Sequence, residues 1–408
     1  MNNIRVKYFC ILAIIILLII GICHLSSTAK ASVKSDFVTS NKNFALDFFQ
    51  YLRNNPNNKD KNLIFSPISI QIAGGLLYAG AEGKTANEIL KGFSLPGNDK
   101  ESVNNVFSTF FNNNKNLLSS GNFYLANKIY VMNGFSLKPN YNEIATKYYH
   151  SDIENINFVD SINSAKSIND WVIEHTDGKI KDLVESDSFD LLTRMYIVNA
   201  VQFKGEWENK FDSSNTGIDD FYVTPSIKIP LEMMQKTGQI EAKNFYDISA
   251  TGVNLKYKDS DLSFYILTTQ NYDQPLSDLE NKLDATFLSD LFEQTKDPIS
   301  VQLKLPKFEF ELTTDLKAAL KELNVNTMFT SDADFTSILD TTEQLMVSDG
   351  VHKAYIKIDE EGTEASAASG ISISSRMGPM TININHPFLY FIKTSDGKIL
   401  FMGRFTGQ

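Results

Sequence analysis

The sequence predicts one large α+β domain, with helices dominating the first half and a mostly antiparallel sheet at its centre. Capped helical patterns come before residue 100, and runs typical of strands become clear later in the chain. After residue 31 the chain shows no break in composition that resembles an interdomain linker. At 408 residues it is long enough to bury an extensive core.

The N-terminus has the pattern of an export signal. Arg5 and Lys7 give a positive start, residues 9–23 form an apolar run, and Ala29 and Ala31 supply the small residues of a cleavage site. We therefore expect secretion. An uncleaved membrane anchor is the alternative, because the apolar run is only slightly shorter than the roughly 17 residues that a spanning helix needs.

Cleavage divides the chain into a signal peptide, residues 1–31, and a mature domain, residues 32–408, that is secreted and extracellular. Both cysteines, Cys10 and Cys23, lie in the signal peptide, so the mature chain has no thiol. It must be stabilised by its core rather than by disulfides. Metal sites built on cysteine are excluded as well.

The mature chain is acidic. The signal peptide carries three of the 38 basic residues and none of the 49 acidic ones, which leaves 35 basic residues and a net charge of −14. Such a charge argues against nucleic acid as a partner. An acidic extracellular surface is enough to explain it.

Two helices are predicted early in the mature chain. Ser66 and Pro67 form a cap and a first-turn proline, and apolar residues then recur at helical spacing beside small ones, namely Ile68, Ile72 and Leu76 beside Ala73, Gly74 and Gly75. This pattern indicates a closely packed, buried helix. Thr85 and Glu88 have the spacing of a capping box that opens a second helix.

Strand patterns follow in the second half. Residues 195–203 form a short apolar run suited to a strand buried on both faces, and apolar residues alternate with polar ones over 354–359. Near the end, residues 388–392 and 399–405 flank Asp396-Gly397, a strong hairpin signal.

The motifs of common hydrolases are missing. The five histidines lie in no His-Glu-x-x-His motif and beside no Gly-x-Ser-x-Gly turn. Residues 80–85 resemble a phosphate-binding loop only superficially, because two residues separate the glycines where the motif requires four. A turn between two helices explains this stretch better. Trp207 is more simply a packing residue than a ligand-stacking one.

The segment after residue 359 combines two properties. Its small and polar residues are typical of a flexible surface linker. With strand periodicity, however, one side is small or apolar and the other is polar or small. The first side carries Thr363, Ala365, Ala367, Ser369, Ile371 and Ile373, and the second carries Glu364, Ser366, Ala368, Gly370, Ser372 and Ser374. The segment therefore has a face that a sheet could bury.

Six ordered motifs resemble those of the serpin family. Residues 360–368 are similar to the hinge of inhibitory serpins. The other motifs are NLIFSPIS at 62–69, YIVNAVQFKGEW at 196–207, ADF at 333–335, HKA at 352–354, and HPFL at 386–389 with LFMGR at 400–404. The resemblance covers essentially the whole mature chain. It implies the serpin fold, a single domain with a central sheet and an exposed reactive-centre loop at about residues 360–382.

The resemblance further implies a suicide-substrate inhibitor of trypsin-like serine proteases. Gly362 matches the glycine from which the reactive bond is counted, and fourteen residues later comes Arg376, so cleavage is expected between Arg376 and Met377. The protease would be held as a covalent acyl-enzyme while the freed hinge enters the central sheet. Met377 remains open as an alternative specificity residue.

The other site residues follow from the same resemblance. The implied hinge contains Glu361, Gly362, Thr363, Glu364, Ala365, Ser366, Ala367 and Ala368. Ser66, Ser69, Asn199 and His352 match the shutter, a hydrogen-bonded cluster beneath the strands that must separate. Trp207 matches the breach, where insertion begins.

The expected partner is a trypsin-like protease bound by a monomer. No metal, cofactor or nucleic acid is expected, and no membrane contact after signal removal. Heparin is not indicated, because residues 99–122, around a helix that binds heparin in some serpins, contain only Lys100 and Lys115 as basic residues. A non-inhibitory serpin that acts as a carrier, storage protein or chaperone is the alternative, although no proline, charge or bulky residue lies on the inward face of the hinge.

Overall fold

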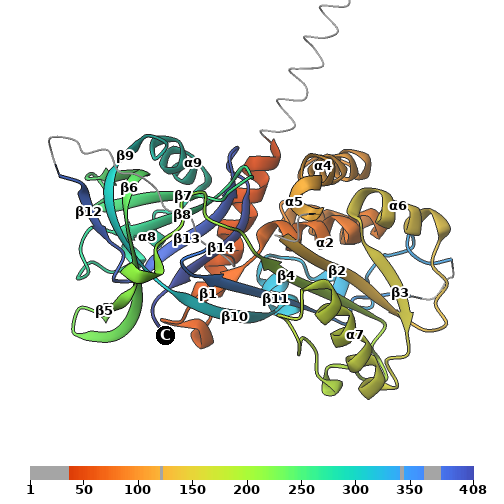
Figure 1. Ribbon diagram of the computed structural model, residues 1–408. Coiled ribbons are helices and arrows are strands. Elements are labelled where there is room, and N and C mark those ends of the chain that lie inside the picture. The colour runs from red at the N-terminus through yellow and green to blue at the C-terminus, as the bar shows by residue number, and fades with distance from the viewer. Residues whose placement is uncertain (1–35, 120–122, 341–343, 363–377) are drawn as a thin grey trace, which may run out of the picture.

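The computed structural model describes residues 36–119, 123–340, 344–362 and 378–408. The predicted signal peptide, the hinge residues from Thr363 to Ala368, and Arg376 and Met377 lie outside the described residues. In the described part, helices and two sheets form one α+β domain, which confirms the predicted fold class (Figure 1).

The smaller sheet has five strands in the order β10-β11-β4-β2-β3. Its strands are β10 (Phe308–Asp315), β11 (Asp349–Ile358), β4 (Met195–Phe203), β2 (Phe123–Met132) and β3 (Asp152–Ile156). Every residue of β4 is buried, as expected for a strand covered on both faces. The strand predicted over 354–359 is the second half of β11.

The two middle strands of this sheet, β4 and β11, run parallel to each other. Their register extends from the pair Asp349 and Tyr196 to the pair Tyr355 and Gln202. On their outer sides, β4 pairs antiparallel with β2, and β11 pairs antiparallel with β10. We call the contact between β4 and β11 the parallel seam.

The larger sheet has nine strands. Its order is β1-β14-β13-β8-β7-β6-β9-β12, with β5 paired to β6, and all its pairings except β9 with β12 are antiparallel. The strands are β1 (Leu63–Phe65), β5 (Gly217–Thr224), β6 (Ile227–Phe245), β7 (Ala250–Lys256), β8 (Leu262–Thr269), β9 (Pro298–Pro306), β12 (Met380–Asn383), β13 (Phe388–Thr394) and β14 (Ile399–Phe405). The predicted hairpin is confirmed: β13 and β14 pair antiparallel, and Gly397 takes a φ of 89° in their turn.

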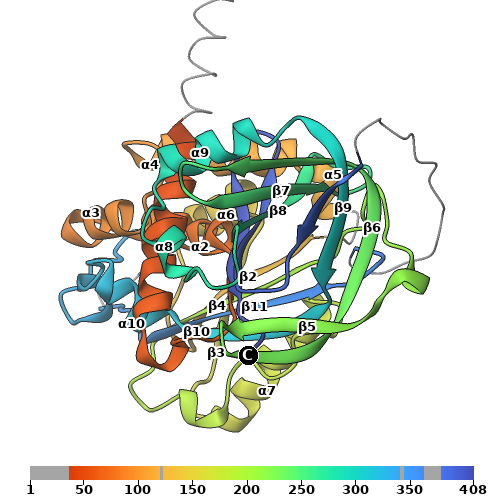
Figure 2. The same ribbon diagram turned by 90° about the vertical axis from the view of Figure 1, so that its left-hand side faces the viewer.

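Most helices come early in the chain, as predicted. A first helix covers residues 36–54 of the described part. The others are α2 (Pro67–Gly80), α3 (Gly83–Gly92), α4 (Lys100–Asn113), α5 (Lys115–Ser119), α6 (Pro139–Tyr149), α7 (Ser161–His175), α8 (Ser277–Glu280), α9 (Ala285–Gln294) and α10 (Leu316–Glu322), with 3₁₀ turns at Pro56–Asn58, Ser186–Ser188, Ser213–Asn215 and Thr327–Phe329. Figure 2 shows α3 and α10 on one side of the molecule and β6 and β9 on the other.

Helix α2 packs against the inner face of the five-stranded sheet, and all of its residues are buried. Its N-cap is Ser66, whose hydroxyl accepts a hydrogen bond from the backbone N–H of Ser69 at 3.3 Å, and Pro67 is in the first turn. A Cβ at Gly74 would lie 2.2 Å from the ring of Phe93, so the close packing predicted around this glycine is confirmed.

The predicted capping box at Thr85 and Glu88 is wrong. Helix α3 begins at Gly83, and its N-cap residue, Glu82, makes no side-chain cap. The hydroxyl of Thr85 accepts instead from the N–H of Asp334 at 2.9 Å, and the Glu88 carboxylate accepts from the N–H of Thr327 at 2.6 Å. Tertiary contacts therefore use the two side chains that the local pattern assigned to a cap. The turn predicted between Gly80 and Gly83 does connect two helices.

Helix α7 covers part of the outer face of the five-stranded sheet. Side chains of α7 and of the segment that follows it form a second apolar cluster with Tyr196 and Val198 of β4 and Val351 and Tyr355 of β11. This cluster is separate from the main core, which contains the opposite face of the same strands. The parallel seam is therefore covered on both faces.

Candidate functional site

The end of β11 is anchored to the segment that follows β4. The backbone N–H of Trp207 donates to the carbonyl oxygen of Glu361, and the indole Nε1 donates to that of Asp359, both at 2.9 Å. The indole is 1% exposed and stacks on Tyr257 with ring centroids 4.7 Å apart. Trp207 is thus a packing residue that also fixes the backbone where the predicted hinge begins.

Gly362, the last described residue of the predicted hinge, occupies a position that only glycine tolerates. Its φ is 115°, and a Cβ there would lie 2.2 Å from the carbonyl oxygen of Gly205 and 2.6 Å from the nitrogen of Trp207. Gly362 forms antiparallel bridges with both Glu206 and Asp359. The chain therefore leaves Gly362 between the extensions of β4 and β11, at one end of the parallel seam.

Replacing Gly362 by Ala should loosen this anchor. The substitution adds backbone strain of about 1–3 kcal/mol and forces apart two backbone segments that cannot yield easily. We expect a lower melting temperature and faster hydrogen exchange at the amides of Trp207 and Phe211. Gly378→Ala is the matched control, because a Cβ at Gly378 meets nothing within 4 Å. Equal melting temperatures for the two variants would contradict the anchor.

Two acidic residues before Gly362 are held by lysines. Glu361 pairs with Lys210 at 2.7 Å, and Glu360 pairs with Lys307 at 3.1 Å. The hydrogen bond to Glu361 raises the pKa of Lys210. Burial works against ionisation of Glu360, but hydrogen bonds from Thr216 and Lys307 outweigh it and lower the pKa of this carboxyl. These contacts hold both carboxylates beside the end of the seam.

A buried polar cluster lies under the middle of the parallel seam. It consists of the four residues Ser66, Ser69, Asn199 and His352, together with Asn127 of β2, and we call it the seam cluster. Asn199 is opposite His352 in one strand pairing and opposite Asn127 in the other, so the three side chains form one row across the sheet.

Hydrogen bonds join this row to the start of α2. The Asn199 amide donates to the Ser69 hydroxyl and carbonyl oxygens, both at 2.9 Å, and also to the Asn127 side chain. The Ser66 hydroxyl donates to the carbonyl oxygen of Leu400 at 2.6 Å. Every polar member has a partner, as buried polar groups require.

The tautomer of His352 follows from its two partners. The backbone N–H of Ser66 donates to Nε2 at 3.1 Å, so Nε2 carries no proton. Nδ1 must then carry it and donate to Oδ1 of Asn199, 2.5 Å away. Complete burial lowers the pKa of His352 to about 3, so the ring stays neutral over the physiological range.

His352 should make stability depend on pH. Its folded pKa of about 3 lies below the ordinary histidine pKa of 6.5, so the stabilisation is complete above pH 6.5 and is lost as the pH falls toward 3. The loss amounts to about 1.4 kcal/mol per pH unit, or roughly 2 kcal/mol at pH 5.

The measurement is denaturant unfolding of the wild type and of His352→Gln at pH 7 and pH 5. Burial also lowers the pKa of His386, so both proteins should lose some stability in acid. The wild type should lose about 2 kcal/mol more than the variant. Equal losses would mean that His352 does not titrate in this way.

Sequence reasoning missed Asn127. It lies between Ala126 and Lys128 in β2, an otherwise largely apolar strand, and it is 8% exposed. A single amide in such a run indicates a specific hydrogen-bond partner, because an unpaired buried amide is costly. That signal was available in the sequence.

Among the described residues, no group of three or more histidine, cysteine or acidic residues could hold a metal ion. Among the same residues, no helix is long and apolar enough to cross a membrane.

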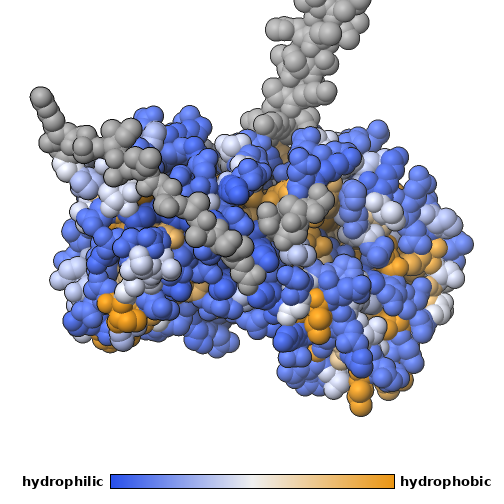
Figure 3. All heavy atoms as spheres, in the orientation of Figure 1, coloured by the Kyte–Doolittle hydropathy of each residue, from blue (hydrophilic) through white to orange (hydrophobic). Residues whose placement is uncertain are grey.

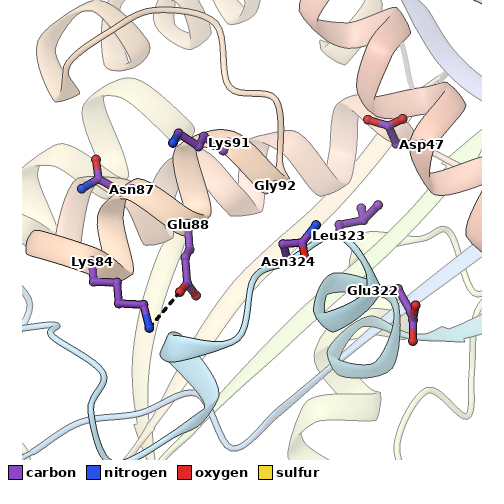
Figure 4. Close-up of a pocket in the computed structure, with 9 residues that line it drawn as sticks. All are labelled: Asp47, Lys84, Asn87, Glu88, Lys91, Gly92, Glu322, Leu323 and Asn324. Atoms are coloured by element: carbon purple, nitrogen blue, oxygen red, sulfur yellow. Dashed lines mark ion pairs between the residues drawn. The ribbon is translucent and has the colours of Figure 1, made fainter.

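A surface pocket of about 560 Å³ lies beside α3. Its lining mixes Lys84 and Lys91 with carboxylates that include Asp47 and Glu322 (Figure 4). Lys84 points toward Glu88, with their charged atoms 3.5 Å apart, rather than forming part of a phosphate-binding loop. The Glu88 carboxylate also accepts a hydrogen bond from the backbone N–H of Thr327, so this ion pair has a structural role.

A protein-family model described as Serpin (serine protease inhibitor) matches residues 39–407. The chain belongs to the serpin family. Serpins are inhibitors of proteases rather than enzymes, which agrees with the missing hydrolase motifs.

Two relatives from the silkworm Bombyx mori match nearly the whole chain of this serpin. An antitrypsin is 33% identical over 404 residues, which cover 97% of this chain and 98% of the relative. Antichymotrypsin-2 is 34% identical over 384 residues, which cover 92% of this chain and 100% of the relative.

Solved structures show the same fold. Serpin48 of the insect Tenebrio molitor matches with a TM-score of 0.81 and 28% identity, covering 92% of this chain and 98% of that one. A cleaved Serpin 42Da matches with a TM-score of 0.82 and 30% identity, covering 92% and 99% of the two chains. The predicted fold family is therefore confirmed.

In this serpin the residues singled out from the sequence form two groups. Ser66, Ser69, Asn199 and His352 are joined in the seam cluster. Trp207, Glu361 and Gly362 meet at the end of the parallel seam. The other hinge residues and the predicted reactive bond lie outside the described residues.

Proposed function

We propose that this serpin is a secreted inhibitor of trypsin-like serine proteases that is cleaved between Arg376 and Met377 and traps the protease as an acyl-enzyme. One observation supports this proposal above the others. Gly362 is bridged to the extensions of both β4 and β11 at the end of the parallel seam, and Arg376 follows fourteen residues later. The segment between them begins where a new strand would have to enter.

The register at Gly362 supports insertion as a strand. If both antiparallel pairings at Gly362 continue, each later residue pairs with a residue one position earlier on each neighbouring strand. The count runs back from Glu206 on one side and from Asp359 on the other. Ala367 then falls beside Val201 and Ala354, which already face each other across the seam. The two bridges thus specify a single consistent register between the strands.

The same register explains which side of the hinge is small. Directly opposed residues in antiparallel strands have side chains on the same face. The side with Ala365 and Ala367 would join Phe203 and Val201 in the main core. Small side chains suit a strand that must enter a covered, close-packed seam, because bulk or charge there would have to be accommodated as the strands separate.

Ser369 fits this arrangement as well. Continuing the register places it beside Asn199 and His352, in the polar row of the seam cluster. Its hydroxyl would arrive where hydrogen-bond partners are already buried, while the alanines before it would arrive among apolar residues. At Ala365, Ala367 and Ser369 the polarity of the inward face therefore matches that of the neighbouring sheet residues.

Inhibition on this proposal is a competition between two steps. The protease serine attacks the carbonyl carbon of Arg376, forming an ester with the Arg376 acyl group, and the proton it gives up leaves with the new amino group of Met377. Insertion must then finish before water hydrolyses the ester. It replaces one parallel strand pairing by two antiparallel pairings, which adds a row of backbone hydrogen bonds.

Arg376 supports a trypsin-like target rather than another serine protease. Its guanidinium can pair with the carboxylate at the base of a trypsin-like specificity pocket. Between Gly362 and Pro387 the chain contains no lysine and no second arginine. The two silkworm relatives carry names that refer to trypsin and to chymotrypsin at nearly equal identity, so the specificity proposal depends on this residue.

The test is titration of trypsin with the purified protein. We expect a complex that survives denaturing electrophoresis and a released C-terminal peptide whose mass begins at Met377. A break after Met377 would favour a chymotrypsin-like or elastase-like target. Cleavage without any covalent complex would contradict inhibition and support a non-inhibitory serpin.

Secretion is tested at the N-terminus. The proposed signal peptide predicts a mature protein that starts at Ser32, because the small residues Ala29 and Ala31 suit signal peptidase. N-terminal sequencing of protein from the culture medium measures this directly. Membrane-bound protein that still begins at Met1 would contradict secretion.

A further inference from the structure

The turn after β2 carries the single Asn-Gly pair of the chain, Asn133 and Gly134. Both residues are exposed, between the half-buried Met132 and the buried Phe135. The backbone N–H of Phe135 donates to the carbonyl oxygen of Met132 at 3.3 Å, which closes the turn. Gly134 takes a φ of 97°, a value that favours glycine. The turn lies where β2 ends beside β3, in the right-hand part of Figure 1.

Hydrogen bonds from β3 hold both sides of this turn. The side-chain amide of Asn155 donates to the carbonyl oxygens of Met132, at 3.2 Å, and of Phe135, at 3.0 Å. The backbone N–H of Asn133 donates to the carbonyl oxygen of Ile156 at 2.9 Å. The chain is therefore fixed on either side of the peptide bond in the middle of the turn.

Among the described residues, no group binds the middle of the turn. Neither the side chain of Asn133 nor the backbone N–H of Gly134 has a hydrogen-bond partner in this part of the chain. A Cβ at residue 134 would meet nothing within 4 Å, so open space surrounds this position. Rotation within Asn133 can therefore bring its side-chain carbonyl carbon onto the nitrogen of Gly134.

We propose that Asn133 is a site of spontaneous covalent modification in the folded protein, where ring closure onto Gly134 converts the asparagine into isoaspartate and aspartate. The nitrogen of Gly134 loses its proton and forms a C–N bond to Cγ of Asn133. The bond from Cγ to the side-chain nitrogen breaks, and that nitrogen leaves as ammonia with the proton. Water then opens the cyclic imide at either of its two carbonyl carbons. This inference does not depend on the proposed function.

The two products affect the turn differently. Opening at the side-chain carbonyl carbon leaves an ordinary aspartate and adds one negative charge. The surface in Figure 3 is mainly hydrophilic, and an exposed carboxylate on such a surface stays hydrated, so the charge alone costs little. Opening at the main-chain carbonyl carbon leaves Gly134 attached through Cγ, which adds a methylene group to the main chain. That longer chain lies between the two carbonyl groups bound by Asn155, so the isoaspartate form strains or breaks these hydrogen bonds.

A second asparagine followed by a small residue provides an internal control. Asn163 precedes Ser164 in α7, where the backbone N–H of Ser164 donates to the carbonyl oxygen of Asp160 at 2.9 Å. The Asn163 amide donates to the carboxylate of Asp160 at 2.8 Å. Both groups that would have to react are bound within the helix, so Asn163 should keep its amide.

The experiment incubates the purified protein at neutral and at mildly alkaline pH and follows both sites by peptide mass mapping. Asn133 should gain the mass of the amide-to-acid conversion, faster at the higher pH because the nitrogen of Gly134 must lose its proton. Asn163 should not. An isoaspartate-specific methyltransferase with labelled S-adenosylmethionine should label the peptide that contains residue 133. An intact Asn133 in the folded protein, under conditions in which the urea-unfolded chain reacts, would overturn the inference.

Three variants test the route. Gly134→Ala should slow the conversion about tenfold, or ~1.4 kcal/mol on the barrier, because the added Cβ lies next to the attacking nitrogen. Asn133→Gln keeps an amide in the turn but would have to close a larger ring, so it should not convert over the same time. Asn133→Asp carries the charge without the extra methylene, so the Phe135 amide should exchange hydrogen more slowly in this variant than in the isoaspartate form. Conversion of Gly134→Ala at the wild-type rate would contradict ring closure onto this nitrogen.

Discussion

Thr363→Arg should convert this serpin from an inhibitor of trypsin into a substrate. Thr363 is the first inward-facing residue after the anchored Gly362, and the proposed register places it beside Gly205 and Ile358. Ile358 is 1% exposed, so an arginine there would have to lose its hydration as the seam opens. That costs several kcal/mol, and each ~1.4 kcal/mol on the insertion barrier slows insertion tenfold. Hydrolysis of the acyl-enzyme should then be faster than insertion, and active protease should be released.

The measurements are cleavage after Arg376, the yield of covalent complex, and the melting temperature of the cleaved product. Cleavage should continue, the complex should disappear, and the large rise in melting temperature on cleavage should be confined to the wild type. Glu364→Arg is the matched control, because residue 364 belongs to the outward side of the hinge. A Thr363→Arg protein that still traps trypsin at the wild-type stoichiometry would contradict insertion as the mechanism.

Arg376→Ala should abolish most inhibition of trypsin. Removing one partner of a buried, hydrogen-bonded charge pair costs about 2–5 kcal/mol or more, a factor of roughly 30 to several thousand in the association rate constant. Arg376→Lys is the control, because a lysine still offers a positive charge to the same pocket. Both variants should unfold at the same temperature as the wild type. An Arg376→Ala protein with undiminished activity against trypsin would place the reactive bond elsewhere.

Where burial and local pattern agreed, the sequence predicted the elements correctly. The apolar run 195–203 has the same bounds as β4, and the Ser66 cap begins α2 as predicted. The capping box at Thr85 and Glu88 failed, because both side chains bind backbone groups more than 200 residues later in the chain. A local pattern cannot reveal such a competitor.

The candidate site was only partly predictable. Resemblance supplied Asn199 and His352, but nothing in the sequence specifies that they are opposed across parallel strands. Strand pairing joins residues 153 positions apart, and such contacts depend on the topology of the whole sheet. The anchor at Gly362 has the same origin, since its close neighbours belong to the segment after β4.

The parallel seam affects the lifetime of the native state. If the hinge inserts as proposed, the fold gains a row of hydrogen bonds when a strand joins it, so it is not at its lowest free energy beforehand and its lifetime is set by a barrier. A seam that opens for the hinge would also accept another extended segment of suitable register, including one from a neighbouring molecule or an added peptide. Storage life should therefore fall as temperature or protein concentration rises, even where equilibrium unfolding is negligible.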